Sequence, residues 1–520
     1  MLKSLPRVLF LCLSFIALSA SFLFAQQNPV RRFHRADRFA ISPPLRELPL
    51  SGGAESPILT SGSSFAPGLS FLGLGHGFPN FTVSADAPDS NLAAGSSQVV
   101  QWANIAFAIF DKSTGAVEAG PLMTGSVWQS LGGACASGSN AASELIVQWD
   151  RANQRWVLSQ NTLTGPPYET CVAVSTSSDA TGTYYLYAFS QGSLLPESPK
   201  WGVWSNGYYQ TQGEFTGSGY VGPELCAYNS AKLVAGDGSA EQICFTLAPA
   251  DGLPLPADID SGLAPPANED EFFLSLWDPS HLSLYSLHPD YQNPQNSSVT
   301  GTNGSQLIAV PAFTPACNGA YDGNCVPQKD TSNQLQVLGD RLMYRVAYWE
   351  DTPQASVRAT PPRPLPSQHW YVVHDSAAAG GNQAPRWYEF TALIRAVPVT
   401  SISLFQSGTF APDSNHRWMG SIARDKAFDL LLGYSESSAS MYPSIAVTGR
   451  VLTDPLGTME PEVMLLSGSG SQLGTSWGNF SSMRLDPDGC TFWYTNEYYT
   501  ADLARDWSTQ LATARFSGCQ

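Results

Sequence analysis

Residues 408–434 read GTFAPDSNHRWMGSIARDKAFDLLLGY, which predicts a polar loop, a short strand, a tight turn and a second strand. The opening pentapeptide APDSN, residues 411–415, recurs letter for letter at residues 87–91. A strand-like run follows that copy as well, at residues 99–110. Two copies of one loop-plus-hairpin, far apart in the chain, indicate a sheet module that repeats.

Further run–turn–run units follow from residue 97 onward, and no long 3.6-residue period interrupts them. The seven units fall near residues 99–110, 144–159, 201–211, 271–285, 340–350, 419–434 and 480–494. Their turns carry Asp150, Asn206, Asp278, Asp425 and Asp488, whose side chains can bond nearby backbone N–H groups. The pattern predicts an all-β fold, a β-propeller with seven blades of four-stranded antiparallel sheet. Six or eight blades stay open, and a pair of β-sandwiches would leave the repeated unit unexplained.

The N-terminus predicts export. Lys3 and Arg7 precede the apolar run of residues 8–24, and Ala25 offers a small residue for cleavage, as in a secretory signal peptide. We expect residues 1–25 to be the signal, residues 26–80 a Pro/Ser/Gly-rich leader and residues 81–520 the propeller. The leader has no clear period and is expected to wrap the surface or stay partly disordered. No later stretch predicts a transmembrane segment, so the expected location is secreted, periplasmic or at the cell surface.

Charge and cysteine content narrow the class of protein. Without Lys3 and Arg7, 24 basic residues face 43 acidic ones, a net charge of about −19 that repels phosphate backbones and argues against nucleic acid as a partner. Eight cysteines remain beyond the signal, and an even number in an exported chain predicts disulfides. Pairing in sequence order is the simplest scheme, although spacing does not fix it. The eight are Cys135, Cys171, Cys226, Cys244, Cys317, Cys325, Cys490 and Cys519.

Several phrases carry a resemblance to known proteins. Residues 88–91, 172–184, 199–204, 338–345, 416–421 and 479–498 resemble a group of uncharacterised secreted bacterial β-propeller proteins. That resemblance implies the propeller fold and no catalytic residue. Residues 486–493 also resemble the Asp-box turn of sialidase-like propellers. This weaker likeness would assign Arg341, Arg345 and Arg417 to an arginine triad and Tyr388 and Glu389 to a Tyr–Glu pair.

The loops that enter the innermost strands carry the predicted ligand site. In a propeller such loops meet around the central funnel. A rim of Arg, His and Trp suits a sugar that bears a carboxylate, because Arg binds the carboxylate with two N–H bonds and Trp stacks on the ring. The alternative is that these side chains join neighbouring blades. The candidates are Arg341, Arg345, Arg417, Trp418, Trp201, Trp477 and Asn479.

Catalytic and metal-binding roles are further hypotheses. His374, Glu389, His416 and Asp340 are candidates for acid–base work in a glycoside hydrolase or polysaccharide lyase. The oxygens of Asp89, Asn91, Asp413 and Asn415 are of the kind that calcium takes, although an Asx turn explains the same loops. The leading hypothesis is a glycan-binding protein that uses the funnel rim. The alternatives are an enzyme on a polysaccharide and a scaffold that docks other proteins, and the sequence leaves open whether the protein is an enzyme.

Overall fold

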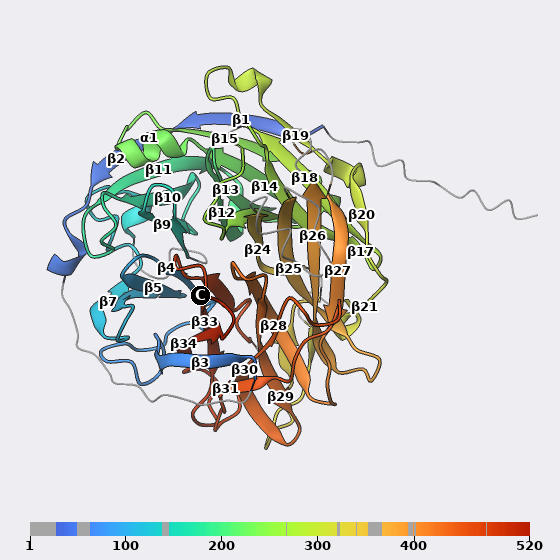
Figure 1. The fold of residues 1–520 in the computed structure, drawn as a ribbon. Coiled ribbons are helices and arrows are strands. Elements are labelled where there is room, and N and C mark those ends of the chain that lie inside the picture. Colours follow the sequence, from blue (N-terminus) through green and yellow to red (C-terminus); the bar gives the residue numbers. More distant parts are fainter. Residues whose placement is uncertain are drawn as a thin grey trace, which may run out of the picture.

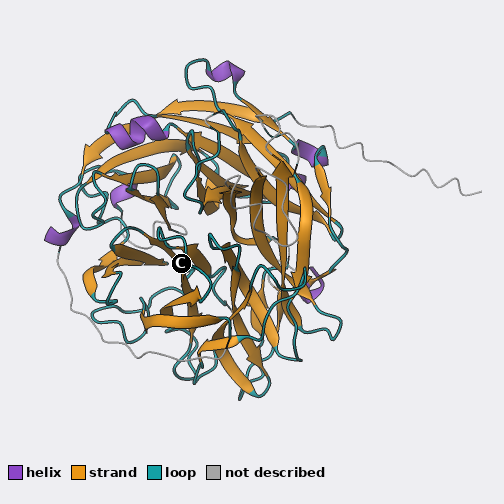
Figure 2. Cartoon of the chain, viewed as in Figure 1, coloured by secondary structure: helices purple, strands orange, loops and turns teal. Residues whose placement is uncertain are grey.

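The computed structural model describes residues 28–48, 63–137, 145–266, 268–319, 323–339, 341–351, 367–393, 399, 402–474 and 476–520. Strands form almost all of its regular structure, as Figure 2 shows, so the predicted all-β class is confirmed. The one α-helix in these ranges is α1 (Ser230–Ala235), and the 3-10 turns are Leu45–Glu47, Ala134–Ala136, Pro249–Asp251, Pro294–Asn296, Thr302–Gly304 and Ala316–Gly319. None of the helices described is long and apolar enough to cross a membrane. The predicted signal peptide and Asp340 lie outside the described residues.

The described strands form seven sheets, one of them ten-stranded and one two-stranded. When the ten-stranded sheet is divided at its parallel pair and the two-stranded sheet is left aside, seven antiparallel units result. Units 1 to 3 consist of β4 (Asn91–Ala94), β5 (Gln98–Ala103), β6 (Ala106–Asp111) and β7 (Val117–Met123); β8 (Ile146–Asp150), β9 (Arg155–Asn161), β10 (Tyr168–Ser175) and β11 (Tyr184–Gly192); and β12 (Leu195–Val203), β13 (Tyr208–Thr216), β14 (Gly219–Tyr228) and β15 (Glu241–Thr246). Unit 4 has β16 (Leu255–Ile259), β17 (Glu271–Asp278) and β18 (His281–His288), with β19 (Ser298–Thr300) and β20 (Leu307–Ala309) both paired to β18.

Units 5 and 6 consist of β24 (Leu342–Asp351), β25 (Ser367–Ala377), β26 (Gln383–Leu393) and β27 (Ser403–Thr409), then β28 (His416–Arg424), β29 (Leu430–Ser438), β30 (Met441–Arg450) and β31 (Val463–Leu466). Unit 7 joins β32 (Ser482–Leu485), β33 (Thr491–Tyr498) and β34 (Ser508–Phe516) to β3 (Phe65–Leu72), so a strand from near the N-terminus completes the last unit. The short β21 (Thr314–Pro315) pairs with β25, and β22 (Gly323–Val326) pairs with β23 (Leu335–Val337).

The first strands of the seven units meet around a common centre (Figure 1). Each contacts the first strand of the next unit, in the order β4, β8, β12, β16, β24, β28, β32 and back to β4. We call these the inner strands. β16 pairs with β24 in parallel, and the other six junctions are bridged by hydrogen bonds. The bridges are Asn91 Nδ2 to Leu145 O, Gln148 to Trp201 O, Val203 N to Asp258, Arg424 to Asp351, Met483 N to Ser421 and Arg484 to Leu92 O.

Neighbouring inner strands lie close enough that residue size matters. A Cβ added at Gly202 of β12 would lie 2.0 Å from the carbonyl oxygen of Ala257 in β16, so only glycine fits there. Large aromatic side chains fill the space between units, as where Trp418 and Trp477 lie 5.3 Å apart between ring centroids. Most residues of the inner strands are buried on both faces, and these buried residues include polar and charged side chains such as Gln148, Asp258 and Arg484.

Aspartates form the predicted turns. Asp150 accepts a hydrogen bond from the backbone N–H of Asn153, and Asp425 accepts from Ala427 and Asp429. Asp488 accepts in the same way from Cys490 and Thr491. Two units differ from the prediction. Residues 99–110, expected as one run, form the second and third strands of unit 1, and residues 271–285 form those of unit 4. In both units the inner strand precedes the predicted run and is short, with four residues in β4 and five in β16.

Disulfides and early strands hold the periphery. The four disulfides are Cys135–Cys171, Cys226–Cys244, Cys317–Cys325 and Cys490–Cys519, which is pairing in sequence order. Such bonds are typical of proteins that fold in an oxidising compartment. The described part of the expected leader contributes three strands. β1 (Val30–Arg35) pairs with β15 and β2 (Arg38–Ile41) pairs with β11, each as a fifth strand of its sheet, and β3 completes unit 7.

Candidate functional site

A groove of about 890 Å³ lies at the start of β28, beside the turn between β25 and β26. Its walls combine main chain from small residues with hydroxyl, amide and charged side chains. They include Phe313, Ser376, Asn382, Arg386, Asp413 and His416. Asp413 and His416 were predicted from the sequence, whereas Arg386, on β26, was not. The groove therefore lies at the entrance of an inner strand, where the sequence analysis expected a ligand.

Arg386 is held in a fixed position on the groove wall. Its guanidinium donates to the Tyr388 hydroxyl (2.9 Å), to Thr409 Oγ1 (2.9 Å) and to the carbonyl of Pro311 (2.6 Å). It also lies over the rings of Phe313 and Tyr388, 5.9 and 5.5 Å from their centroids. Within the described ranges, no carboxylate lies at ion-pair distance from it. All its partners are neutral, so its positive charge stays available to a ligand.

His374 lies beneath the groove and not on its surface. Its side chain is fully buried, with Nδ1 at 2.8 Å from the carbonyl of Asp375 and Nε2 at 3.0 Å from the Tyr388 hydroxyl. Nδ1 must therefore carry the proton and donate it to the carbonyl, and Nε2 accepts from Tyr388. Burial lowers the pKa of His374 to about 3, so the ring is neutral. The predicted acid–base histidine contacts the groove wall through Phe313, whose ring centroid lies 4.5 Å from that of the imidazole, and through Tyr388, which bonds Arg386.

His416 lies on the groove wall and is half-buried. Its Nδ1 accepts a hydrogen bond from the backbone N–H of Gln383 at 3.2 Å. The neutral ring then carries its proton on Nε2, which makes that nitrogen a donor. Burial lowers the pKa of His416, which favours this neutral form.

Glu389 points away from Tyr388, because adjacent residues of a strand face opposite sides of the sheet. Its carboxylate is fully buried and contacts His369 Nδ1 (2.9 Å), Tyr371 (3.0 Å) and Gln406 (2.6 Å). The structure therefore separates Glu389 from both His374 and Tyr388, and the expected Tyr–Glu pair does not form. His369 also contacts Asp351 at 3.1 Å. Burial would raise the pKa of Asp351, but Arg424 and His369 outweigh it and lower the pKa to about 2.

Arg417 occupies the centre of a carboxylate cluster. Asp413, Glu436 and Glu462 place oxygen atoms within 4.8 Å of one another. Arg417 binds all three, at 2.8 Å from Asp413, 2.9 Å from Glu436 and 2.5 Å from Glu462. Asn415 donates to Glu436 at 2.8 Å. The guanidinium thus supplies a positive charge among these carboxylates, and Asp413 also accepts the backbone N–H of Asn415 at 2.8 Å, which is the Asx turn given as the alternative to a calcium site. Arg417 is fully buried and does not reach a ligand.

The identical pentapeptide at 87–91 has a different role. Asp89 accepts from the backbone N–H of Asn479, and Asn91 accepts from the backbone N–H of Val147 at 2.9 Å. Both Asp89 and Asn91 are buried. These contacts join unit 1 to units 7 and 2, so the oxygens considered as possible calcium ligands accept hydrogen bonds from backbone amides.

The remaining rim candidates are dispersed. Trp201, Trp418 and Trp477 are at most 1% exposed, so their rings pack against protein and cannot stack on a sugar. Arg341 lines a separate pocket of about 440 Å³, together with Phe215 and Tyr220. Arg345 lies at the centre of the ring. The structure therefore does not assemble Arg341, Arg345 and Arg417 into a triad.

Sequence reasoning named Arg345 as a ligand-binding residue but missed its partners at the centre of the ring, Asp258 and Asp260, and the neighbouring Arg484. Arg345 of β24 binds Asp258 at 3.2 Å and also pairs with Asp260, while Arg484 of β32 pairs with Asp258 and donates to Tyr344. These groups come from three inner strands and are almost completely buried. The sequence signal was the Asp–Ile–Asp alternation at residues 258–260, which places both carboxylates on one face of a strand.

Comparisons with known proteins do not assign a function to this chain, so the functional proposal rests on the geometry of the site. No protein-family model and no curated protein sequence matches the chain. A protein of unknown function from Dyadobacter fermentans aligns at 9% identity and TM-score 0.31, over 72% of this chain and 95% of that one. A thermostable family-43 glycoside hydrolase aligns at 11% and 0.28 over 73% and 91%, and polysaccharide lyase Uly1 at 8% and 0.33 over 93% and 100%. Similarities this low decide neither fold nor function.

Proposed function

We propose that the protein is an exported seven-bladed β-propeller that binds an acidic polysaccharide in the groove beside Arg386. Three observations support the propeller: seven antiparallel units, a closed cycle of contacts between inner strands, and the pairing of β3 with β34. The signal-like N-terminus and the four disulfides support export.

The observation that carries the proposed ligand is Arg386. A guanidinium with only neutral partners, on the wall of a groove in an acidic protein, favours a ligand that brings a carboxylate. His416 Nε2 adds a donor for a sugar hydroxyl, and Phe313 adds an apolar surface for a ring. A polymer of uronic acid residues combines these three groups, and the groove volume is within the range of small-ligand sites.

Retention on immobilised polygalacturonate, compared with a neutral polysaccharide, tests this proposal. We expect the wild type to bind the uronate polymer, and Arg386→Gln to weaken binding by about tenfold or more, since a hydrogen bond to a charged group contributes about 1.5–3 kcal/mol. Arg386→Lys keeps the charge but loses the planar fork and should bind with intermediate strength. Arg155→Gln is the matched control, because Arg155 bonds only to carbonyls of its own turn and does not line the groove. Equal retention of Arg386→Gln and wild type, with both folded, would refute the assignment.

Cleavage of the same polymer is the second candidate. The specific observation is a hydrogen-bond chain that leads from Arg386 through the Tyr388 hydroxyl to Nε2 of His374, a neutral base. A lyase needs a cation on the uronate carboxylate and a group that removes the adjacent proton. Absorbance from unsaturated uronates in the same incubation tests this role. Cleavage that Tyr388→Phe abolishes would support it, and retention without any product would leave a binding protein.

A further inference from the structure

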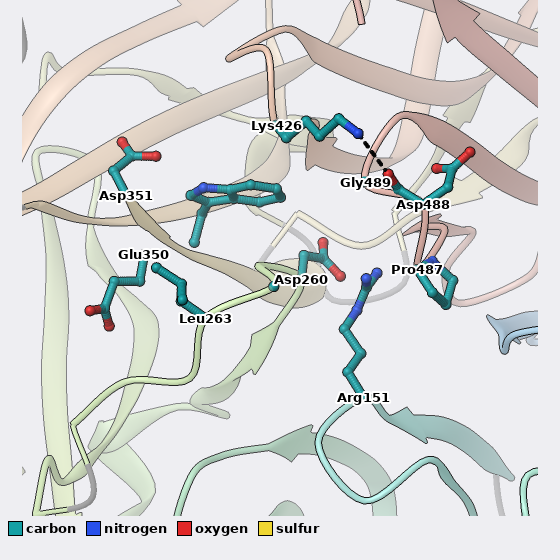
Figure 3. A pocket seen from close by; sticks show the side chains of 11 residues that line it. Arg151, Asp260, Leu263, Glu350, Asp351, Lys426, Pro487, Asp488 and Gly489 are labelled. Atoms are coloured by element: carbon teal, nitrogen blue, oxygen red, sulfur yellow. Dashed lines mark hydrogen bonds between the residues drawn. The ribbon is translucent and has the colours of Figure 1, made fainter. Parts of the chain in front are cut away.

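A second pocket, of about 380 Å³, lies at the opposite end of β28 from the groove. Its walls come from residues at or just beyond the ends of five inner strands, β8, β16, β24, β28 and β32. Figure 3 shows Arg151 and Lys426 on two sides of the loop formed by Pro487, Asp488 and Gly489, with Asp260 between Arg151 and Asp351. Arg151 and Asp260 also line the narrow space that continues toward the charged centre of the ring.

Both cations of this pocket bind main-chain carbonyls of one short segment. Arg151 donates to the carbonyls of Leu485 and Asp486, and Lys426 donates to the carbonyl of Asp488 at 3.1 Å. In the part of the chain that the structure describes, neither side chain forms an ion pair. Both residues line the same pocket, so the two positive charges face one cavity.

The carboxylates of the pocket, in contrast, already have partners. Asp260 pairs with Arg345, and Asp351 pairs with Arg424 at 2.6 Å. Asp488 accepts two backbone N–H groups and pairs with Arg515 at 3.3 Å. Glu350 accepts from the Tyr348 hydroxyl, and burial raises the pKa of Glu350, which favours its neutral form.

The charges therefore do not cancel within the pocket. Each acidic group of the pocket has a cation other than Arg151 and Lys426, or hydrogen bonds, as its partner. Among the described residues, the hydrogen-bond acceptors of Arg151 and Lys426 are main-chain carbonyls. Burial lowers the pKa of Arg151 despite the attraction of Asp260 and Asp486, which indicates that its charge is incompletely compensated. An anion placed between the two cations would supply the missing charge.

We infer that this pocket binds a small, doubly charged oxyanion, such as a phosphate group, between Arg151 and Lys426. The planar guanidinium suits two oxygens of one anion, and the ammonium group suits a third as a point charge. The site shares no residue with the groove beside Arg386, so it does not depend on the function proposed for that groove.

Titration of the full mature chain with inorganic phosphate, at constant ionic strength maintained with chloride, tests this inference by calorimetry and thermal melting. At a phosphate concentration of about 100 Kd, we expect a rise in Tm of about 3 °C for a chain of this size. Lys426→Gln should raise Kd by about tenfold, because it removes one charge-assisted hydrogen bond. Lys426 is exposed and bonds only to one carbonyl, so this variant should fold normally.

Arg151→Gln should weaken binding further, and its melting temperature reports any loss of the carbonyl contacts. Arg155→Gln is the matched control, since Arg155 belongs to the same turn and does not line the pocket. The same titration with malonate in place of phosphate would show whether an anion with two carboxylates binds Arg151 and Lys426. The inference is overturned if phosphate produces no binding heat and no change in Tm in the wild type. It is also overturned if Lys426→Gln binds phosphate as tightly as the wild type and the control Arg155→Gln do.

Discussion

Replacing Asp375 with Asn should remove about 3 kcal/mol of the change in stability between pH 5 and pH 8. Asp375 belongs to β25, and its carboxyl group is completely buried. One oxygen accepts a hydrogen bond from the backbone N–H of Met419 in β28 at 3.1 Å, and the other has no partner among the described residues. Burial raises the pKa of Asp375 from 3.8 to about 7, and the bonds from Met419 and Gly420 offset only part of that effect.

The sign of the effect follows from proton binding. Between about pH 4 and pH 7 the folded protein keeps a proton on Asp375 that the unfolded chain has released, so stability falls as pH rises through this window and is level above it. From pH 5 to pH 8 the loss is about 3 kcal/mol, at about 1.4 kcal/mol for each pH unit below the folded pKa. For 520 residues the unfolding entropy is about 1 kcal/mol per kelvin, so Tm should fall by about 3 °C through this residue alone.

Thermal melting of wild type and Asp375→Asn from pH 5 to pH 8 measures this difference. Asn keeps an acceptor for the Met419 N–H but cannot ionise, so the Tm of the variant relative to that of the wild type should increase as pH rises. Other buried carboxyl groups with raised pKa values, such as Glu214 at about 9 and Asp425 at about 8, change both curves equally and cancel in the comparison. In the control Asp290→Asn, the exposed Asp290 has a lowered pKa because Asn293 donates to it, so this curve should stay parallel to the wild type. A constant gap between wild type and Asp375→Asn across the range would refute the reasoning.

Two further substitutions test the fold and the carboxylate cluster. Gly202→Ala should lower the free energy of unfolding by about 1–3 kcal/mol or more, because its Cβ would overlap the Ala257 carbonyl, whereas Gly217→Ala has open space and should melt like the wild type. Arg417→Ala should lower stability by about 3–5 kcal/mol, because Glu436 and Glu462 lose their buried counter-ion. Calcium should then restore part of the Tm of Arg417→Ala and leave the wild-type Tm unchanged. Thermal melting of both proteins with calcium and with chelator measures this, and an equal change of Tm in the two proteins would contradict it.

Local sequence predicted the units better than the connections between them. Runs and turns such as residues 419–434 determine a hairpin through contacts within about 15 residues, so β28 and β29 lie where the pattern placed them. β16 has only five residues and includes Pro256, too short a signal for an inner strand. β3 pairs with β34 more than 400 residues away, and nothing in residues 65–72 reveals that partner.

The candidate site was less predictable, because residue type does not show which side of a strand faces solvent. Arg417 and Trp418 follow a polar loop, yet both are buried once β28 packs between its neighbours. The two APDSN loops are identical in sequence, but Asp413 binds Arg417 and Asp89 binds the amide of Asn479. Arg386 has no motif around it, and its exposure depends on β27 and the segment before β21.

Partner type, and not residue type, separates the structural cations of this chain from those that we propose to bind ligands. Arg345, Arg424 and Arg484 each pair with a buried carboxylate from another inner strand, so removing one leaves an uncompensated charge in the core and should cost stability. Among the described residues, Arg151, Arg386 and Lys426 hydrogen-bond to neutral oxygens, and each lines one of the two pockets. Removing one of these leaves no buried carboxylate without its counter-ion. Substitutions in the second set should therefore change binding more than melting temperature, and those in the first set should do the reverse.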